Sequence, residues 1–178
     1  MLVLLLLASP PPAVRCLVEA YPQVQAATAT ELIFTDGTRM PLRTRKAAPK
    51  DYAERLATAD LLDQVSQVYP RGEAWPKPPA QNSDPGRLRS DAFFRKIYGA
   101  TAKAVAATTT TITWLPGIVD APLKVSTVNG VHEKLKQVSA ELARLPPEVR
   151  KYVEKPSGTF VWRTIKGTDR LSMHSFAL

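Results

Sequence analysis

The sequence predicts an α+β fold in which short antiparallel strands pack against helices. A dipeptide that favours tight turns, Asp36-Gly37, separates two apolar, β-prone stretches and indicates a hairpin. A β-branched run in the stretch 108–116 predicts a strand centred on 112–114, and a second strand is expected over 123–128, after the turn at Pro116-Gly117. Apolar residues then recur at spacings of three and four over 131–145, as in an amphipathic helix.

The other elements follow from shorter signals. In chain order, we expect a helix over 16–22 closed by Pro22, a helix over 50–70, a proline-rich loop or wrap over 71–89, a helix over 90–102 with Ser90 as its N-cap, and a strand over 158–165. The helix over 50–70 should bury Tyr52, Leu56, Leu61, Val65 and Val68. Asn129 is the expected N-cap of the later helix, whose packing face would consist of Val131, Leu135, Val138, Leu142 and Leu145.

Composition limits the class of protein. A chain of 178 residues that is 44% hydrophobic and 22% charged is typical of a globular protein with a real core. A single cysteine, Cys16, excludes an intramolecular disulfide framework. The formal net charge of +8 favours an anionic partner such as a nucleic acid, a membrane surface or an acidic wall polymer.

The N-terminal segment over 1–15 resembles a secretory signal. An apolar run over 1–8 precedes a serine and three prolines, although the basic residues that usually begin a signal are missing. Eight apolar residues are too few to span a bilayer, which needs about 20. The sequence therefore predicts no membrane-spanning segment. The apolar run is either a secretory signal that directs export or the end of an apolar helix, and both alternatives stay open.

Two histidines are the only imidazoles in the chain. His132 falls in the first turn of the helix expected after Asn129, beside Glu133, and is interpreted as a solvated surface residue. The sequence has no recognisable Ser-His-Asp spacing, phosphate loop, dinucleotide glycine fingerprint or cysteine metal cluster. His174 is different, because it stands in the phrase L-S-M-H-S-F-A-L that ends at Leu178.

This phrase resembles the first half of S-x-H-x-x-G-x-A-x-D, the metal-binding signature of the zinc D-alanyl-D-alanine carboxypeptidases and L-alanyl-D-glutamate peptidases, which share a fold with the Hedgehog signalling domain. Five stretches look like successive blocks of one envelope branch of that family: LIFTDGTRMP, LLDQVSQVYPRG, DPGRLRSDAFFRKIYG, VNGVHEKLKQVSAEL and GTFVWRTIKGTDRLSMHSF. The resemblance implies an N-terminal hairpin, helix and wrap over 16–90 and a partial peptidase domain over 91–178. Its fold would be an incomplete Hedgehog/DD-peptidase-like antiparallel sheet with flanking helices.

The resemblance also implies a site. In the family, the motif histidine and aspartate and a later histidine hold one zinc ion with an open position for water, and a glutamate acts as general base. His174 matches the zinc ligand and Ser172 the motif serine, expected at the substrate. Arg163 is the candidate for the arginine that stabilises the oxyanion, with Arg170 as the alternative. The implied substrates are peptidoglycan stem peptides with D-amino acids, cleaved in the cell envelope, and the bond cleaved stays open.

The sequence departs from the motif in ways that affect activity. Ala177 occupies the glycine position, which is a costly change if φ there is positive. The motif aspartate would fall beyond Leu178, and the glutamate and second histidine are absent. At most one of three zinc ligands is present, so we expect a C-terminally truncated fragment without peptidase activity. If strands are missing, Leu171, Met173 and Phe176 should be poorly covered.

Two other classes of function are compatible with a basic chain of this kind: a cell-wall-binding module and a nucleic-acid binder. If the terminus is natural, the chain would be a non-catalytic module that binds the cell wall, including its anionic polymers, with an affinity that salt weakens. A basic nucleic-acid binder is disfavoured, because the cationic residues are dispersed and no stacking motif with interleaved aromatic residues is present. Peptidoglycan is thus the expected partner, with no nucleic acid.

Overall fold

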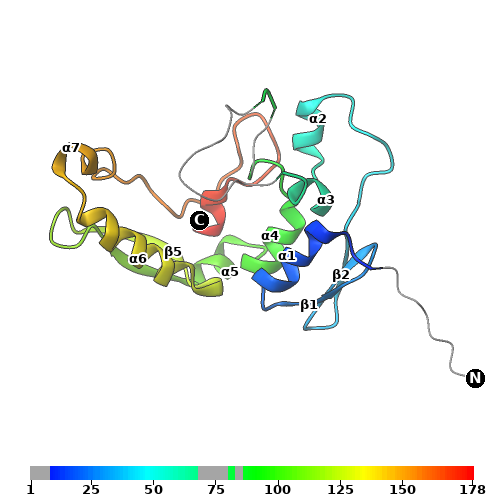
Figure 1. The fold of residues 1–178 in the computed structure, drawn as a ribbon, viewed down its shortest axis with the longest axis horizontal. Coiled ribbons are helices and arrows are strands. Elements are labelled where there is room, and N and C mark those ends of the chain that lie inside the picture. The colour runs from blue at the N-terminus through cyan, green and yellow to red at the C-terminus, as the bar shows by residue number, and fades with distance from the viewer. Residues whose placement is uncertain (1–8, 68–79, 83–85) are drawn as a thin grey trace, which may run out of the picture. The chain divides into compact units, whose positions relative to one another are not determined.

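The computed structural model describes residues 9–67, 80–82 and 86–178. Two small antiparallel sheets and several helices confirm the predicted α+β class. The chain divides into two compact units, Met1–Phe93 and Phe94–Leu178, which run from blue to green and from green to red in Figure 1. Residues 1–8 of the signal-like segment and most of the proline-rich wrap lie outside the described residues. Among those that are described, no helix is long and apolar enough to cross a bilayer.

The first unit is built on a three-stranded antiparallel sheet. Its strands are β1 (Val24–Ala27), β2 (Glu31–Phe34) and β3 (Arg39–Pro41), hydrogen-bonded in the order β1-β2-β3, and helix α1 (Pro12–Ala20) contacts β1. α1 buries Val14 and Leu17, which are three residues apart and share one helix face. β2 buries Leu32 and Phe34, which alternate along the strand and therefore point to the same side of the sheet.

The predicted hairpin at Asp36-Gly37 is present between β2 and β3. The Asp36 carboxylate accepts hydrogen bonds from the Thr38 N–H at 3.1 Å and from the Thr38 hydroxyl. Gly37 has a φ of 79°, a value that glycine adopts without a steric penalty. Local turn chemistry therefore sets this connection, as the sequence indicated. The pairing of β1 with β2 had no such local signal and was not predicted.

The helix predicted over 50–70 is wrong as a single element. Two short helices, α2 (Tyr52–Ala57) and α3 (Leu61–Gln64), replace it. Asp60 has extended backbone and accepts the Asp63 N–H at 3.1 Å, while the Asp63 carboxylate accepts the Asp60 N–H at 3.2 Å. This reciprocal capping box begins a new helix and interrupts the old one. Leu61 is the one predicted core residue here that is buried, and Val68 lies outside the described residues.

Helix α4 (Asp91–Tyr98) begins after Ser90, whose hydroxyl accepts the Phe93 N–H at 3.3 Å as the predicted N-cap. The second unit then contains α5 (Ala102–Ala107), β4 (Thr109–Trp114), β5 (Ala121–Ser126), the 3-10 turn η1 (Val128–Gly130), α6 (Val131–Ala143), α7 (Pro147–Arg150) and the 3-10 turn η2 (Met173–Phe176). β4 and β5 are the two strands predicted in this region and form an antiparallel pair, with Thr109 opposite Ser126 and Trp114 opposite Ala121.

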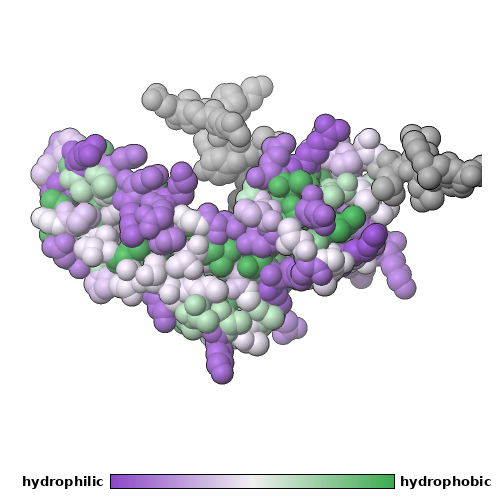
Figure 2. Space-filling model, turned by 90° about the horizontal axis from the view of Figure 1, so that it is seen from below, coloured by the Kyte–Doolittle hydropathy of each residue, from purple (hydrophilic) through white to green (hydrophobic). Residues whose placement is uncertain are grey.

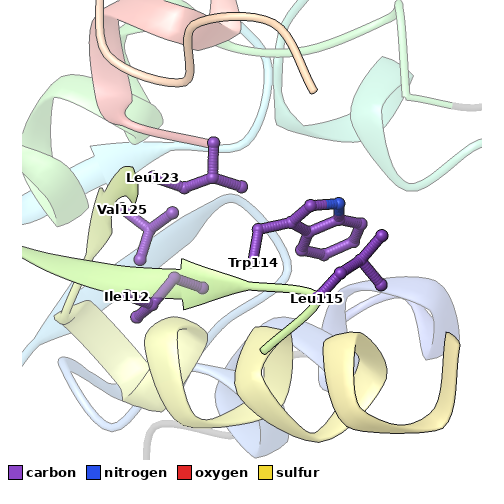
Figure 3. Packing of buried hydrophobic residues seen from close by; sticks show 5 residues of the cluster. All are labelled: Ile112, Trp114, Leu115, Leu123 and Val125. Atoms are coloured by element: carbon purple, nitrogen blue, oxygen red, sulfur yellow. The ribbon is translucent and has the colours of Figure 1, made fainter. Parts of the chain in front are cut away.

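The core of the second unit lies between this sheet and α6. Figure 3 shows its five central side chains, Ile112, Trp114, Leu115, Leu123 and Val125. Leu135 and Leu142 of α6 pack against this cluster. The Trp114 indole N–H also donates to the Val153 carbonyl at 2.8 Å, so the polar end of a buried ring has a partner.

Helix α6 differs from its prediction at both its start and its buried face. Asn129 lies in η1 with a φ of 54°, and the N-cap of α6 is Gly130, with a φ of 72°. Val138, expected to pack, is 45% exposed, whereas its neighbour Ser139 is buried. The Ser139 hydroxyl accepts the Leu115 N–H at 2.7 Å, which turns this polar side of the helix toward the sheet.

The strand predicted over 158–165 is not a regular strand. A single antiparallel bridge joins Thr164 to Leu171, and the surrounding backbone has no further ladder. The expected poor coverage is also wrong for two of three residues: Leu171 is 4% exposed and Phe176 is fully buried, while Met173 is half-buried. Phe176 is covered by the rings of Phe94, Tyr98 and Trp162, whose centroids lie 5.6, 6.2 and 6.4 Å away.

Candidate functional site

The three candidate site residues lie in one feature, which we call the closing hairpin (residues 161–178). Its two arms are joined by backbone hydrogen bonds from Ile165 N–H to the Arg170 carbonyl at 2.8 Å and from Ser172 N–H to the Arg163 carbonyl at 2.9 Å. A third bond runs from Val161 N–H to the His174 carbonyl at 3.0 Å. The hairpin therefore brings the backbone of Arg163 beside Ser172 and keeps both near His174.

Ser175 fixes this arrangement and was missed by the sequence analysis. Its side chain is fully buried, and its hydroxyl accepts the Arg163 N–H at 3.0 Å and donates to the Arg163 carbonyl at 2.9 Å. Because this buried hydroxyl bonds to both the N–H and the carbonyl of Arg163, it holds the two arms in register. The only signal in the sequence is a serine between His174 and Phe176, which does not reveal a partner twelve residues away.

His174 lies in η2 and is half-buried. Within the described part of the chain, its Nδ1 atom is buried and has no hydrogen-bond partner. Such an atom costs about 1–3 kcal/mol of stability. Histidines that bind a metal through one ring nitrogen usually donate the other to a carboxylate or carbonyl. His174 therefore has Nε2 left for a metal or substrate, and its Nδ1 lacks the acceptor that would orient the ring.

The other two candidates differ in exposure. Ser172 is 7% exposed and precedes η2, without a capping hydrogen bond from its side chain. Arg163 is exposed, and its side chain makes no hydrogen bond or ion pair to the residues that the structure describes. Arg170, the alternative, is half-buried on the opposite arm. An exposed guanidinium is available to an anionic group, whereas the buried Ser172 hydroxyl is not open to a large ligand.

Ala177 has a positive φ, which is the condition under which alanine at the glycine position of the motif is expected to be costly. It caps η2 with φ 57° and ψ 41°, in the left-handed region, and is 1% exposed. Its carbonyl accepts the Ser126 N–H at 3.1 Å, so β5 holds it there. This conformation costs an alanine about 1–2 kcal/mol. The glycine position of the motif thus coincides with a positive φ.

The closing hairpin does not contain a metal site by itself. Across the described ranges, no group of three or more histidine, cysteine, aspartate or glutamate residues could hold an ion. His132 is 23% exposed and its Nε2 lies 3.1 Å from Glu133 Oε1, so it is partly covered rather than fully solvated. A hydrogen bond from Lys136 lowers the pKa of Glu133 and keeps this carboxylate charged beside His132.

Comparison with known proteins identifies no relative: no family model, curated protein or solved structure matches this chain.

Proposed function

We propose that the closing hairpin is the first part of a zinc-peptidase site of the D-alanyl-D-alanine carboxypeptidase type. His174 would supply one zinc ligand and Arg163 would stabilise the oxyanion. Ser172 would stand at the substrate, which requires that its hydroxyl, buried in this structure, becomes exposed when the site is complete. The substrates would be peptidoglycan stem peptides, in the cell envelope. The finer fold assignment, a Hedgehog/DD-peptidase-like sheet, belongs to the same proposal.

The observation that carries the proposal is the backbone of Ala177. The motif places glycine three residues after its histidine, and here that position has a φ of 57°. A geometric need for glycine at this position would produce this coincidence, because left-handed backbone is where glycine is favoured. Separately, the two arms of the closing hairpin bring the backbones of Ser172 and Arg163 together.

The described residues do not fit a complete zinc site. One half-buried histidine cannot provide the three protein ligands that hold a catalytic zinc ion, and among the described residues no group of three or more possible ligands is present. The remaining ligands would have to come from outside the described residues. We therefore expect the 178-residue chain to have no peptidase activity, and we derive no reaction step from it.

The coding sequence beyond codon 178 provides the test. An A-x-D phrase directly after Leu178, followed by a glutamate and a histidine, would support the proposal. In that longer protein, His174→Ala should abolish stoichiometric zinc binding and His132→Ala should leave it unchanged. A genuine stop codon after Leu178, or zinc binding that survives His174→Ala, would contradict it.

A specific feature of the charge distribution favours a second function, binding to the cell wall without catalysis. Residues 94–178 contain 13 lysines and arginines but only six aspartates and glutamates, whereas residues 1–93 contain 11 and ten. Nearly all of the formal net charge of +8 thus belongs to the second unit. Anionic wall polymers would be attracted to this unit at low ionic strength.

Sedimentation with insoluble peptidoglycan over a salt series tests this second function. Retention at low salt that decreases as salt is added would support the module. A chain that stays in the supernatant at low salt would exclude it. Removal of the anionic polymers from the wall material should reduce retention if they are the binding partner.

A further inference from the structure

The outer edge of β4 presents backbone groups that form no hydrogen bond with the residues that the structure describes. The Thr127 N–H donates to the Thr108 carbonyl at 2.8 Å, and these residues continue the register that pairs Thr109 with Ser126. Hydrogen-bonded and non-hydrogen-bonded pairs alternate in an antiparallel ladder. The Thr110 and Ile112 backbones therefore bond to β5, and those of Thr109, Thr111 and Thr113 point away from it.

The opposite edge, on β5, follows the same alternation and is partly covered. The outward groups of β5 belong to Pro122, Lys124 and Ser126. Ser126 N–H donates to the Ala177 carbonyl at 3.1 Å, and the Lys124 carbonyl accepts the Thr159 hydroxyl. Pro122 has no N–H to leave unpaired. A proline, a lysine and the closing hairpin thus protect this edge, which is how natural sheets avoid unwanted pairing.

The edge of β4 has none of these protections. Within residues 9–67, 80–82 and 86–178, no hydrogen bond joins the outward backbone groups of β4 to another segment. The strand reads Thr-Thr-Thr-Ile-Thr-Trp, with no charge, proline or glycine, and five of its six residues are β-branched. Thr111 and Thr113 are exposed. This edge is therefore suited to receive one more strand.

The charge of the second unit indicates which strand would bind. Residues 94–178 carry an excess of seven positive charges, and Lys124 stands opposite Thr111 on the exposed face of the sheet. Two copies of this unit would repel each other, whereas an acidic strand would be attracted. On the face seen in Figure 2, hydrophobic and hydrophilic residues of the described chain are interspersed.

From these observations we infer that the outer edge of β4 is a docking site for an extended, acidic segment of another polypeptide. The segment would add a third strand beside β4, with its backbone bonded to Thr109, Thr111 and Thr113. Acidic side chains on its exposed face would lie toward Lys124. This inference does not depend on the proposed peptidase function.

The test is fluorescence polarisation with the full 178-residue chain and short labelled peptides. The first peptide alternates glutamate with valine, the second replaces glutamate with lysine, and the third is the first with N-methyl groups on alternate residues, which block its backbone donors. We expect the first to bind with an affinity that salt weakens. The other two should bind at least about tenfold more weakly, because they lose charge attraction or several hydrogen bonds.

A matched pair of variants locates the site. Thr111→Pro removes an outward N–H without removing a bond to β5, and should weaken binding of the first peptide about tenfold. Thr111→Val keeps the N–H and the β-branched shape, and should bind as the parent chain does. If the N-methylated peptide bound the parent chain as tightly as the first peptide does, the inference would be overturned. This comparison uses the parent chain, so it remains valid even if Thr111→Pro does not fold. A dimer in sedimentation that Thr111→Pro dissociates would also overturn it, because the edge would then be occupied by a second copy.

Discussion

The two units keep their buried polar groups in different ways. In the first unit, Asp60 and Asp63 are 1% and 4% exposed, and Arg45 and Arg55 reach them: Arg45 Nη2 lies 2.8 Å from Asp63 Oδ2 and Arg55 Nε lies 3.0 Å from Asp63 Oδ1. In the second unit, the buried polar side chains among the described residues are all serines, at 126, 139, 172 and 175. The first unit buries charged side chains as well as the hydroxyl of Ser90, whereas the second unit buries only neutral hydroxyls among its described polar side chains.

This difference shows where each unit is vulnerable. A buried charge is stable only with its partner, so loss of one carboxylate or guanidinium leaves an uncompensated charge. A buried hydroxyl that forms hydrogen bonds lowers the stability little, and its removal reduces the free energy of unfolding only by the contribution of those hydrogen bonds. The first unit should therefore respond strongly to acid and to substitution of one aspartate, and the second should respond weakly to acid.

The largest expected effect is that of Asp63→Ala. This change removes the carboxylate that Arg45 and Arg55 share, leaves Arg45 only the more distant Asp60 Oδ2 at 3.7 Å from its Nε, and removes half of the α3 capping box. We expect the first unit to lose about 3–5 kcal/mol of stability. Hydrogen exchange followed by mass spectrometry can measure this loss in peptides from residues 9–67, separately from the second unit.

Asp51→Ala is the matched control. Asp51 is an exposed N-cap that accepts the Glu54 N–H at 2.8 Å, and its loss should cost about 1 kcal/mol. Equal losses for the two variants would mean that the buried charges contribute no more than a surface cap, and the contrast between the units would not hold.

In the second unit, Ser175→Ala should have the next largest effect. It removes both hydroxyl bonds to Arg163 and leaves the Arg163 N–H without its acceptor. We expect a loss of about 1–3 kcal/mol. Urea unfolding monitored by tryptophan fluorescence is a suitable measurement, because Trp162 packs 6.4 Å from Phe176. The exposed Ser157→Ala should change stability by less than about 0.5 kcal/mol, and a similar effect for both would contradict the role assigned to Ser175.

Acid should weaken the first unit more than the second. Burial raises the pKa of Asp63, but hydrogen bonds from Arg55 and the Asp60 N–H, with the charges of Arg45 and Arg55, outweigh it and hold the pKa below its ordinary value. A lowered pKa gives stability that is present above the unfolded pKa, about 3.9, and is lost as pH falls below it. The loss should be smaller than in Asp63→Ala, because a protonated carboxyl still forms hydrogen bonds.

Urea unfolding at pH 6 and pH 3 measures this effect, with far-UV circular dichroism for the whole chain and tryptophan fluorescence for comparison. Asp63→Asn should reduce the difference in stability between the two pH values. An unchanged pH dependence in Asp63→Asn would show that other groups cause the acid sensitivity.

The smallest expected effect is a gain from Ala177→Gly. Glycine relieves about 1–2 kcal/mol of left-handed strain, and loss of the buried methyl group costs about 0.8 kcal/mol. The net gain should be about 0.5 kcal/mol, seen as a higher urea midpoint. Ala121→Gly, in β5 where φ is not positive, should instead be destabilising. Destabilisation by both changes would contradict the strain at Ala177.

Local chemistry explains which elements could be predicted from the sequence. The hairpin at Asp36-Gly37 and the β4–β5 pair depend on a turn and on β-branched residues close in sequence, and both were found. The helix over 50–70 was wrong because its apolar spacing continues through Asp60, while the capping box that interrupts it uses polar atoms. Burial of Ser139 depends on Leu115, 24 residues away, which no local pattern reveals.

The same distinction applies to the candidate site. The motif phrase directed attention to Ser172, His174 and Arg163, and the closing hairpin brings their backbones together. Ser175, which fixes the hairpin, acts through Arg163 on the other arm and was not predicted. The outer edge of β4 was missed as well, because strand pairing on one side alone is a property of topology.

The zinc content of the 178-residue chain most directly tests the central claim, which is that the closing hairpin supplies only one ligand of an incomplete zinc site. After incubation with zinc and removal of free metal, the account predicts less than about 0.1 zinc per chain by elemental analysis, since one histidine cannot form a tight site. A ratio near one, lost in His174→Ala and kept in His132→Ala, would contradict it, because the closing hairpin would then belong to a complete metal site.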